Sequence, residues 1–171
     1  IALRESFLFV TCSGGEWYNN GNPEIVEGRV QMRSTGDLSI LGTFLFDDFS
    51  TPWHIVASPI ENRVFVALAG DALQEHSGVS CLEFGEEMND DGEDVYYLNE
   101  LWRTTDSSYG TMHGIDISHD GEIIYVSGRS DGKIYMFDSE NGVSLGSKEL
   151  VNSCGICTGG ISISSPYNIS N

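Results

Sequence analysis

Two histidines of this chain stand directly before short apolar runs that have the pattern of β-strands. His54 lies in the segment Pro52-Trp-His-Ile55, and His113 lies in Thr111-Met-His-Gly114. A neutral imidazole is a good ligand for copper, zinc or iron, and it titrates close enough to neutral pH to act as an acid or base. If the two runs are equivalent strands of neighbouring repeats, both imidazoles reach the same opening, where Asp116 would add a carboxylate. The alternative is that both histidines are ordinary loop or channel-lining residues.

An acidic loop is the strongest candidate for binding a metal ion. Asn89, Asp91 and Asp94 flank Gly92 within the acidic segment 86–94. Oxygen-rich loops of this kind suit calcium as a bound cofactor. The spacing is not that of an EF-hand, because the downstream glutamate and the alternating ligand register are absent. A solvated loop between two strands is the alternative interpretation.

The cysteines favour a structural role. Four are present, and an even number in a loop-rich chain is typical of disulfides in exported proteins. Cys154 and Cys157 are the candidates for a disulfide, since Cys154-Gly-Ile-Cys157 could close a small loop. Free buried thiols are the alternative. A zinc site would need a second close pair of ligands, and Cys12 and Cys81 lie too far apart in the sequence to be one.

Support for nucleophilic catalysis and phosphate binding is weak in the sequence. The Gly-x-Ser-x-Gly pattern occurs at 128–132 and 142–146, but both serines fall in expected turns or strands of a blade and not at the strand-to-helix turn of a nucleophile elbow. No phosphate-binding glycine loop is present. Several aromatic residues fall near expected loops or strand ends, where they would line a carbohydrate or peptide groove or pack one sheet against the next. They are Trp17, Tyr18, Trp53, Trp102 and Tyr109.

The elements that must position these residues are clearest in the segment 114–142. It contains short apolar runs separated by Asp120-Gly121 and Asp131-Gly132, and Asn141-Gly142 closes the third run. Such dipeptides favour tight turns between antiparallel strands. The runs alternate at period two and are rich in β-branched and aromatic residues. With Val143–Leu150 as a fourth strand, the segment has the size of one propeller blade.

This unit recurs along the chain. The segment 55–66 aligns without a gap onto 115–126, so that Phe65 matches Tyr125 and Val66 matches Val126. Segments 7–10, 28–33 and 160–164 match further parts of the unit. We therefore expect an all-β fold, a β-propeller of four-stranded antiparallel blades with about three blade periods. The alignment predicts that the chain enters at the second strand of one blade and stops after the first strand of another.

The most regular repeat resembles the YVTN-type β-propeller family, which is related to the lactonase-like propellers. The match is carried by Ser118-His-Asp-Gly121, Ile124-Tyr-Val126, Asp131-Gly132 and Phe137-Asp138, with His119 in place of the usual proline. The blade around Ser58-Pro59 matches less closely. The resemblance implies a fold and leaves the chemistry open, because propellers serve both as enzymes and as binding platforms.

The domain organisation expected from the repeats is a single partial propeller over residues 1–171. Its blades would cover about 1–50, 51–110 and 111–152, and residues 158–171 would begin a further blade. Three blades leave a ring open and expose two sheets to pairing with another chain. Either the chain is part of a longer propeller, or copies of it complete the ring. In an assembly, the segment 161–164 would supply the inner strand that the first blade lacks.

Charge limits the partners. The chain has 26 acidic and 8 basic residues and a formal net charge of −18. This balance argues against nucleic acid as a partner, since phosphate binding needs a cationic face. No apolar run approaches the roughly twenty residues that span a bilayer, so membrane insertion is not expected. With these partners excluded, we expect the ligand to be a protein or a glycan. We also expect the protein to be extracellular or periplasmic.

Two hypotheses about function follow. The first is a non-catalytic binding or scaffold propeller, exported and part of a larger protein. The second is a propeller enzyme, either a lactonase-like hydrolase or a metal-dependent redox enzyme, with His54, His113 and Asp116 at the mouth of the central channel.

Overall fold

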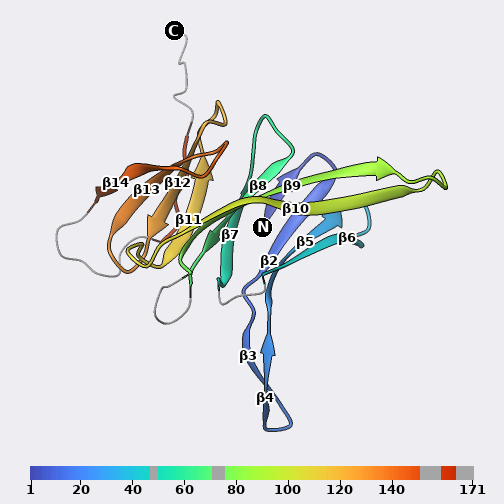
Figure 1. The fold of residues 1–171 in the computed structure, drawn as a ribbon, viewed down its shortest axis with the longest axis horizontal. Coiled ribbons are helices and arrows are strands. Elements are labelled where there is room, and N and C mark those ends of the chain that lie inside the picture. Colours follow the sequence, from blue (N-terminus) through green and yellow to red (C-terminus); the bar gives the residue numbers. More distant parts are fainter. Residues whose placement is uncertain (47–49, 71–75, 151–158, 165–171) are drawn as a thin grey trace.

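The chain folds into three consecutive antiparallel sheets and one projecting hairpin (Figure 1). The computed structural model describes residues 1–46, 50–70, 76–150 and 159–164, with the side chains at 16–19 and 23 set aside. These ranges contain β-strands and no helix, and therefore no helix that could cross a membrane.

Each sheet is one propeller blade with four strands in chain order. The first blade has the strand order β1-β2-β5-β6, the second β10-β9-β8-β7 and the third β11-β12-β13-β14, and all neighbouring strands are antiparallel. The fold predicted from the sequence is confirmed. The strands of the first blade are β1 (Ala2–Arg4), β2 (Phe7–Cys12), β5 (Gly28–Ser34) and β6 (Ile40–Phe46). Those of the second are β7 (Pro52–Ala57), β8 (Arg63–Leu68), β9 (Gly78–Met88) and β10 (Asp94–Thr105). Those of the third are β11 (Met112–Ile117), β12 (Ile123–Gly128), β13 (Lys133–Asp138) and β14 (Ser144–Glu149).

The pairing registers confirm the ungapped alignment of the second and third blades. In β7, Pro52 pairs with Leu68 and Ile55 with Val66, so the register shifts between them. In β11, Met112 pairs with Gly128 and Ile115 with Val126, with the same shift. Both inner strands thus carry an irregularity at the same place. Such an extra residue re-aims the side chains beside it.

The expectation that the chain enters at the second strand of a blade is wrong. The strand β1 occupies the inner position of the first blade, where Ala2 pairs with Phe9 and Arg4 with Phe7. It has only three residues. So short a run cannot display an alternating pattern, which explains why the sequence did not reveal it. The first blade therefore does not need its inner strand from the segment 161–164.

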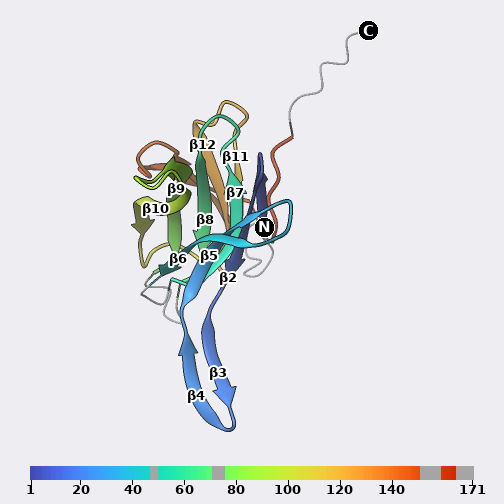
Figure 2. The same cartoon turned by 90° about the vertical axis from the view of Figure 1, so that its right-hand side faces the viewer.

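The projecting hairpin, which was not predicted from the sequence, leaves the first blade between β2 and β5. It consists of β3 (Gly15–Asn19) and β4 (Asn22–Val26), and Figures 1 and 2 show it extending away from the three sheets. Its turn is Asn20-Gly21, and both residues have positive φ angles, 52° and 84°. That geometry is the one for which Asn-Gly is favoured in two-residue hairpins.

The turn glycines of the third blade behave as their sequence predicts. Gly121, Gly132 and Gly142 have φ angles of 78°, 69° and 72°. Asp120, Asp131 and Asn141, which precede these glycines, do not have positive φ angles. The loops are longer than two residues, so only the glycine adopts the left-handed conformation.

Two apolar layers hold the three blades together. One lies between the first and second blades, where the rings of Phe9 and Phe84 are 4.6 Å apart and both side chains are fully buried. The other lies between the second and third blades and includes Phe65, Ile124 and Phe137. Burying each such side chain contributes about 1.5–3 kcal/mol.

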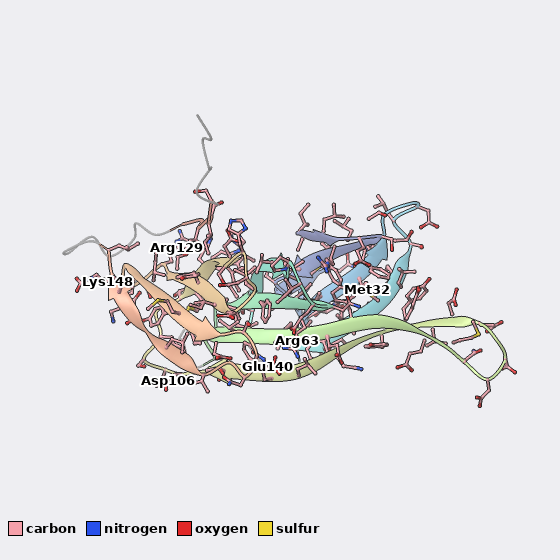
Figure 3. All side chains as sticks on the ribbon, turned by 90° about the horizontal axis from the view of Figure 1, so that it is seen from above. Met32, Arg63, Asp106, Arg129, Glu140 and Lys148 are labelled. Atoms are coloured by element: carbon pink, nitrogen blue, oxygen red, sulfur yellow. The ribbon has the colours of Figure 1, made fainter. Side chains whose placement is uncertain are left out.

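An ion pair crosses the seam between the second and third blades on the side of the short turns. The guanidinium of Arg63 lies 2.7 Å from a carboxylate oxygen of Glu140 and 3.1 Å from one of Glu61 (Figure 3). The side chain of Glu140 is mostly exposed, so the pair contributes no more than about 1 kcal/mol. Burial of apolar side chains, and not this ion pair, dominates the seam.

Candidate binding site at the start of the inner strands

The two histidines come together where the inner strands of the second and third blades begin. His54 is the third residue of β7 and His113 the second residue of β11. Their ring centroids are 4.5 Å apart with an interplanar angle of 61°, and both side chains are half-buried. The expectation that these two imidazoles lie close together agrees with this distance, although His54 and His113 do not occupy equivalent positions in their blades.

Trp53 completes this group of rings. Its indole packs edge to face against His113, with centroids 4.5 Å apart and an angle of 64°. In the register shared by the two blades, Trp53 is the counterpart of His113, and Gly114 is the counterpart of His54. The three side chains Trp53, His54 and His113 are called the ring cluster below.

A guanidinium lies beside the ring cluster. Arg129 follows β12, and its Cζ atom is 5.8 Å from the centroid of the Trp53 ring, which is within reach of a cation–π interaction. The backbone N–H of Arg129 donates a 2.8 Å hydrogen bond to the carbonyl of Thr111, which fixes the loop, while the side chain is exposed.

The electrostatics of the cluster favour a neutral imidazole at His54. Its pKa is lowered from the usual value, first by burial, then by the charge of His113 and of the amino terminus. Both causes penalise the charged form of the ring. His54 is therefore neutral at pH 7, with one ring nitrogen able to donate a hydrogen bond and the other able to accept one.

The projecting hairpin is anchored next to the cluster. The Thr11 hydroxyl, at the end of β2, donates a 2.6 Å hydrogen bond to the carbonyl of Trp53. A Cβ atom at Gly28, where β5 begins, would collide with the ring of Pro52. The base of the hairpin thus lies against the start of β7. We call this side of the sheets, with the ring cluster, Arg129 and the hairpin, the loop face.

The segment 159–164 lies against the inner strand of the third blade. The carbonyl of Gly159 accepts a 2.7 Å hydrogen bond from the Ser127 hydroxyl and lies 3.3 Å from Nδ1 of His113. A Cβ atom at Gly114 would fall 2.7 Å from the backbone nitrogen of Ile161. Only a glycine at that position lets the two backbones approach so closely. The structure assigns no strand to these residues.

Asp116 is placed with this segment and not with the ring cluster. Its neighbours Ile115 and Ile117 are buried between the second and third blades, so its side chain points to the other side of the sheet. The carboxylate accepts hydrogen bonds from the backbone N–H groups of Ile117, at 2.9 Å, and Ile163, at 2.5 Å.

The acidic loop is the tip of the long β9–β10 hairpin, which extends beyond the blade in Figure 1. The side-chain oxygen of Asn89 accepts hydrogen bonds from the backbone N–H groups of Asp91, at 3.0 Å, and Glu93, at 2.8 Å. Asn89 thereby caps the turn that Gly92 makes. In the described ranges, no three side chains of the types His, Cys, Asp or Glu gather as a metal site would need. Calcium binding by Asn89, Asp91 and Asp94 stays a prediction.

The cysteines divide into two groups. Cys12 is an exposed free thiol at the end of β2, and Cys81 is a buried free thiol in β9. Burial raises the pKa of Cys81 to about 12 and keeps it unreactive. The disulfide predicted for Cys154 and Cys157 lies outside the described residues.

The other aromatic residues singled out from the sequence have packing roles wherever their side chains are described. Trp102 packs against Phe65, with centroids 6.0 Å apart, and Tyr109 packs against Tyr135 and Phe137. The side chains of Trp17 and Tyr18 lie outside the described part.

Comparison with solved structures supports the propeller architecture. The β-propeller domain of Cps50 (Swd1) from Myceliophteria thermophila matches 81% of this chain with a TM-score of 0.56 and 10% sequence identity. Hydrazine synthase from Kuenenia stuttgartiensis matches 79% with a TM-score of 0.50 and 12% identity. The chain spans only 41% and 37% of those two proteins. No protein-family model matches the sequence, and neither does any curated protein. At these identities the likeness concerns the fold alone, and the YVTN-type resemblance stays a prediction.

Proposed function

We propose that this chain is part of a non-catalytic β-propeller binding module that holds a protein or glycan ligand on its loop face. The observation that carries the proposal is the ring cluster, in which Trp53 and two imidazoles pack edge to face at the start of two inner strands and remain partly exposed. Rings of this kind offer a rigid surface with an apolar body and polar edges, which suits binding at low entropic cost.

The hairpin β3–β4 enlarges the same face. It leaves the first blade beside Trp53, and Ile25 and Val26 on β4 are 72% and 38% exposed. A two-stranded hairpin has little stability alone, so a partner that packs on the exposed side chain of Ile25 would also stabilise the hairpin. Loops held by a rigid scaffold are the usual carriers of binding sites.

The proposal also covers the type of repeat and the cellular location of the protein. The segment 118–138 supports a YVTN-type repeat through its Ser-x-Asp-Gly turn and its Tyr-Val strand. An exported protein, extracellular or periplasmic, accords with a disulfide at Cys154 and Cys157 and with the acidic composition. Mass analysis of the purified protein before and after reduction would test the disulfide.

A homo-oligomer that completes the ring is the proposed assembly. The sheet face of the first blade that points away from the core carries Leu3 and Leu45, which are 64% and 46% exposed, together with Arg29 and Arg33. The corresponding face of the third blade presents the half-buried side chains of Tyr125, Ile134 and Met136, so apolar contact would join the two faces. Light scattering should give at least twice the mass of one chain. A well-folded monomer would contradict this assembly.

A second candidate function rests on the 4.5 Å approach of His54 and His113. These two rings would provide two nitrogen ligands for a channel metal in a hydrolase or redox enzyme. Metal analysis of the purified protein, beside His54→Ala and His113→Ala variants, separates this candidate from the first. The absence of stoichiometric metal, together with no turnover of esters or lactones, would remove it.

The binding proposal is tested by nuclear magnetic resonance. The ¹⁵N-labelled chain is titrated with a panel of neutral oligosaccharides, acidic sugars and short peptides, and shifted amides are mapped onto the fold. The proposal predicts that a ligand shifts the amides of residues 53, 54, 113 and 129 before those of the short turns. If the panel members shift only amides in other parts of the molecule, the proposal that the loop face binds the ligand is rejected.

A further inference from the structure

Arg129 differs from the well-anchored cations of this acidic chain. Arg63 pairs with Glu61 and Glu140, Arg103 with Glu100, and Lys133 with Asp131. Within the ranges that the structure describes, Arg129 pairs with no carboxylate, and its guanidinium lies over Trp53 instead. Arg29, Arg33 and Lys148 likewise form no ion pair with a carboxylate in the described part, but of these four cations only Arg129 lies over a ring of the ring cluster.

The surroundings of Arg129 favour an anionic ligand group. A guanidinium presents a planar fork of N–H donors that matches a carboxylate and binds it through two parallel hydrogen bonds. The cation–π contact with Trp53, at 5.8 Å, favours one position of the side chain, so less conformational freedom is lost when it binds. The neutral imidazole of His54 adds one N–H donor, whereas Nδ1 of His113 faces the carbonyl of Gly159, and Trp53 offers an aromatic surface on which a ring can pack.

We propose that Arg129 and the ring cluster bind a small ligand that carries one carboxylate on an otherwise uncharged ring. The proposal rests on the binding function assigned to the loop face and specifies its ligand. The carboxylate pairs with the guanidinium of Arg129, and the ring of the ligand lies against Trp53 and His113.

The overall charge of the chain restricts the ligand to a single anionic group. With a formal charge of −18, the protein repels polyanions over a distance set by the ionic strength. One guanidinium offsets this repulsion for one carboxylate but not for a row of them. An acidic sugar and an aromatic acid share the required chemistry, and the choice between them is an outcome of the test.

The test is a titration of the full chain at low ionic strength with methyl glucuronide and with benzoate. Methyl glucoside and benzyl alcohol, which lack the carboxylate, are the matched neutral probes. We expect at least one acid to bind about tenfold or more tightly than its neutral counterpart, because hydrogen bonds to charged groups are worth about 1.5–3 kcal/mol. Binding of the glucuronide alone identifies an acidic sugar as the source, and binding of benzoate alone identifies an aromatic acid.

Variants of Arg129 test whether its guanidinium binds the carboxylate of the ligand. Arg129→Ala should weaken binding of the acid by about tenfold, and Arg129→Lys should weaken it less, since lysine keeps the charge without the planar fork. Lys148→Ala is the control, because Lys148 is an exposed cation on the outer strand β14 and not part of the loop face; Figure 3 labels both cations.

Three results would overturn the proposal: no shift with either acid, equal affinity for the acids and the neutral probes, or unchanged affinity in Arg129→Ala. Tighter binding of a sulfated oligosaccharide than of either acid would overturn the single-carboxylate assignment. If the acids fail while a neutral sugar or a peptide shifts the ring cluster, this inference falls and the binding function stands. If no probe shifts the ring cluster, both fall.

Discussion

The imidazole of His113 packs edge to face against the indole of Trp53, its counterpart in the preceding blade, with ring centroids 4.5 Å apart. The same backbone irregularity in β7 and β11 puts the two side chains at the start of their inner strands. The repeat therefore does more than build the core. It brings one aromatic side chain from each of two blades to one place, and His54 joins them from the next position.

Lowering the pH should destabilise the protein through His54. Because its pKa is lower in the folded chain than the usual 6.5, the unfolded chain binds the proton more readily. The stabilising contribution is complete above about pH 6.5 and is lost as the pH falls through the folded-state pKa. The groups that oppose its protonation are His113 and the amino terminus.

Urea denaturation between pH 7.5 and 5 checks this prediction. The difference in free energy of unfolding between wild type and His54→Gln should change with pH in that window. His119→Gln, an exchange in an exposed turn, should track the wild type. A pH-independent difference for His54→Gln would show that the burial of His54 has no electrostatic consequence.

Removing the hydroxyl of Thr11 should loosen the base of the projecting hairpin. The Thr11→Val exchange deletes the 2.6 Å hydrogen bond to the carbonyl of Trp53 and keeps the β-branched shape. We expect a loss of about 1 kcal/mol in the free energy of unfolding and faster amide exchange at Trp53 and His54. Thr43→Val, at an exposed position of β6, serves as the matched control and should cost less. Equal effects of the two exchanges would contradict the anchoring role.

The two described cysteines should differ sharply in reactivity. A thiol reagent should modify Cys12 within minutes at pH 8, because it is exposed. Cys81 should react only after unfolding, since burial raises its pKa to about 12 and excludes the reagent. Peptide mapping after labelling in buffer and in urea measures both sites. Modification of Cys81 in the native protein would show that the seam between the second and third blades opens.

Gly114→Ala should displace the terminal segment from the inner strand of the third blade. The added Cβ would fall 2.5 Å from the carbonyl oxygen of Gly159 and 2.7 Å from the nitrogen of Ile161. Protection of the Ile163 amide, which is bonded to Asp116, should then be lost in hydrogen exchange. Gly160→Ala is the control, because no atom lies within 4 Å of its added Cβ. Unchanged protection in Gly114→Ala would mean that this close approach does not hold the segment.

The sequence predicted the parts of the fold that repeat, and it missed those that do not. The ungapped alignment of 55–66 onto 115–126 is reproduced by the pairing registers, because both segments carry the same alternation and turn chemistry. In contrast, β1 is too short to show a period, and the hairpin β3–β4 has no counterpart in the other blades. Its Asn20-Gly21 turn was the one local feature that could have revealed it.

The candidate site was predictable only in part for a related reason. Strand starts in neighbouring repeats placed His54 and His113 together, yet the role of Trp53 depends on a packing angle that no spacing encodes. Asp116 was expected at the channel mouth from alternation alone. Alternation predicts the side of the sheet on which the carboxylate lies, but not which backbone N–H group will bind it. Here that group belongs to Ile163 in the segment 159–164.

The central proposal, that the ring cluster binds the ligand of this propeller, is tested most directly by comparing dissociation constants for wild type and Trp53→Ala. The ligand is the panel member that shifts the loop-face amides most strongly, and the fold of the variant is checked from its remaining amide resonances. We predict that Trp53→Ala weakens binding by about tenfold or more, as expected for an aromatic anchor. The same dissociation constant for both proteins would contradict the proposal.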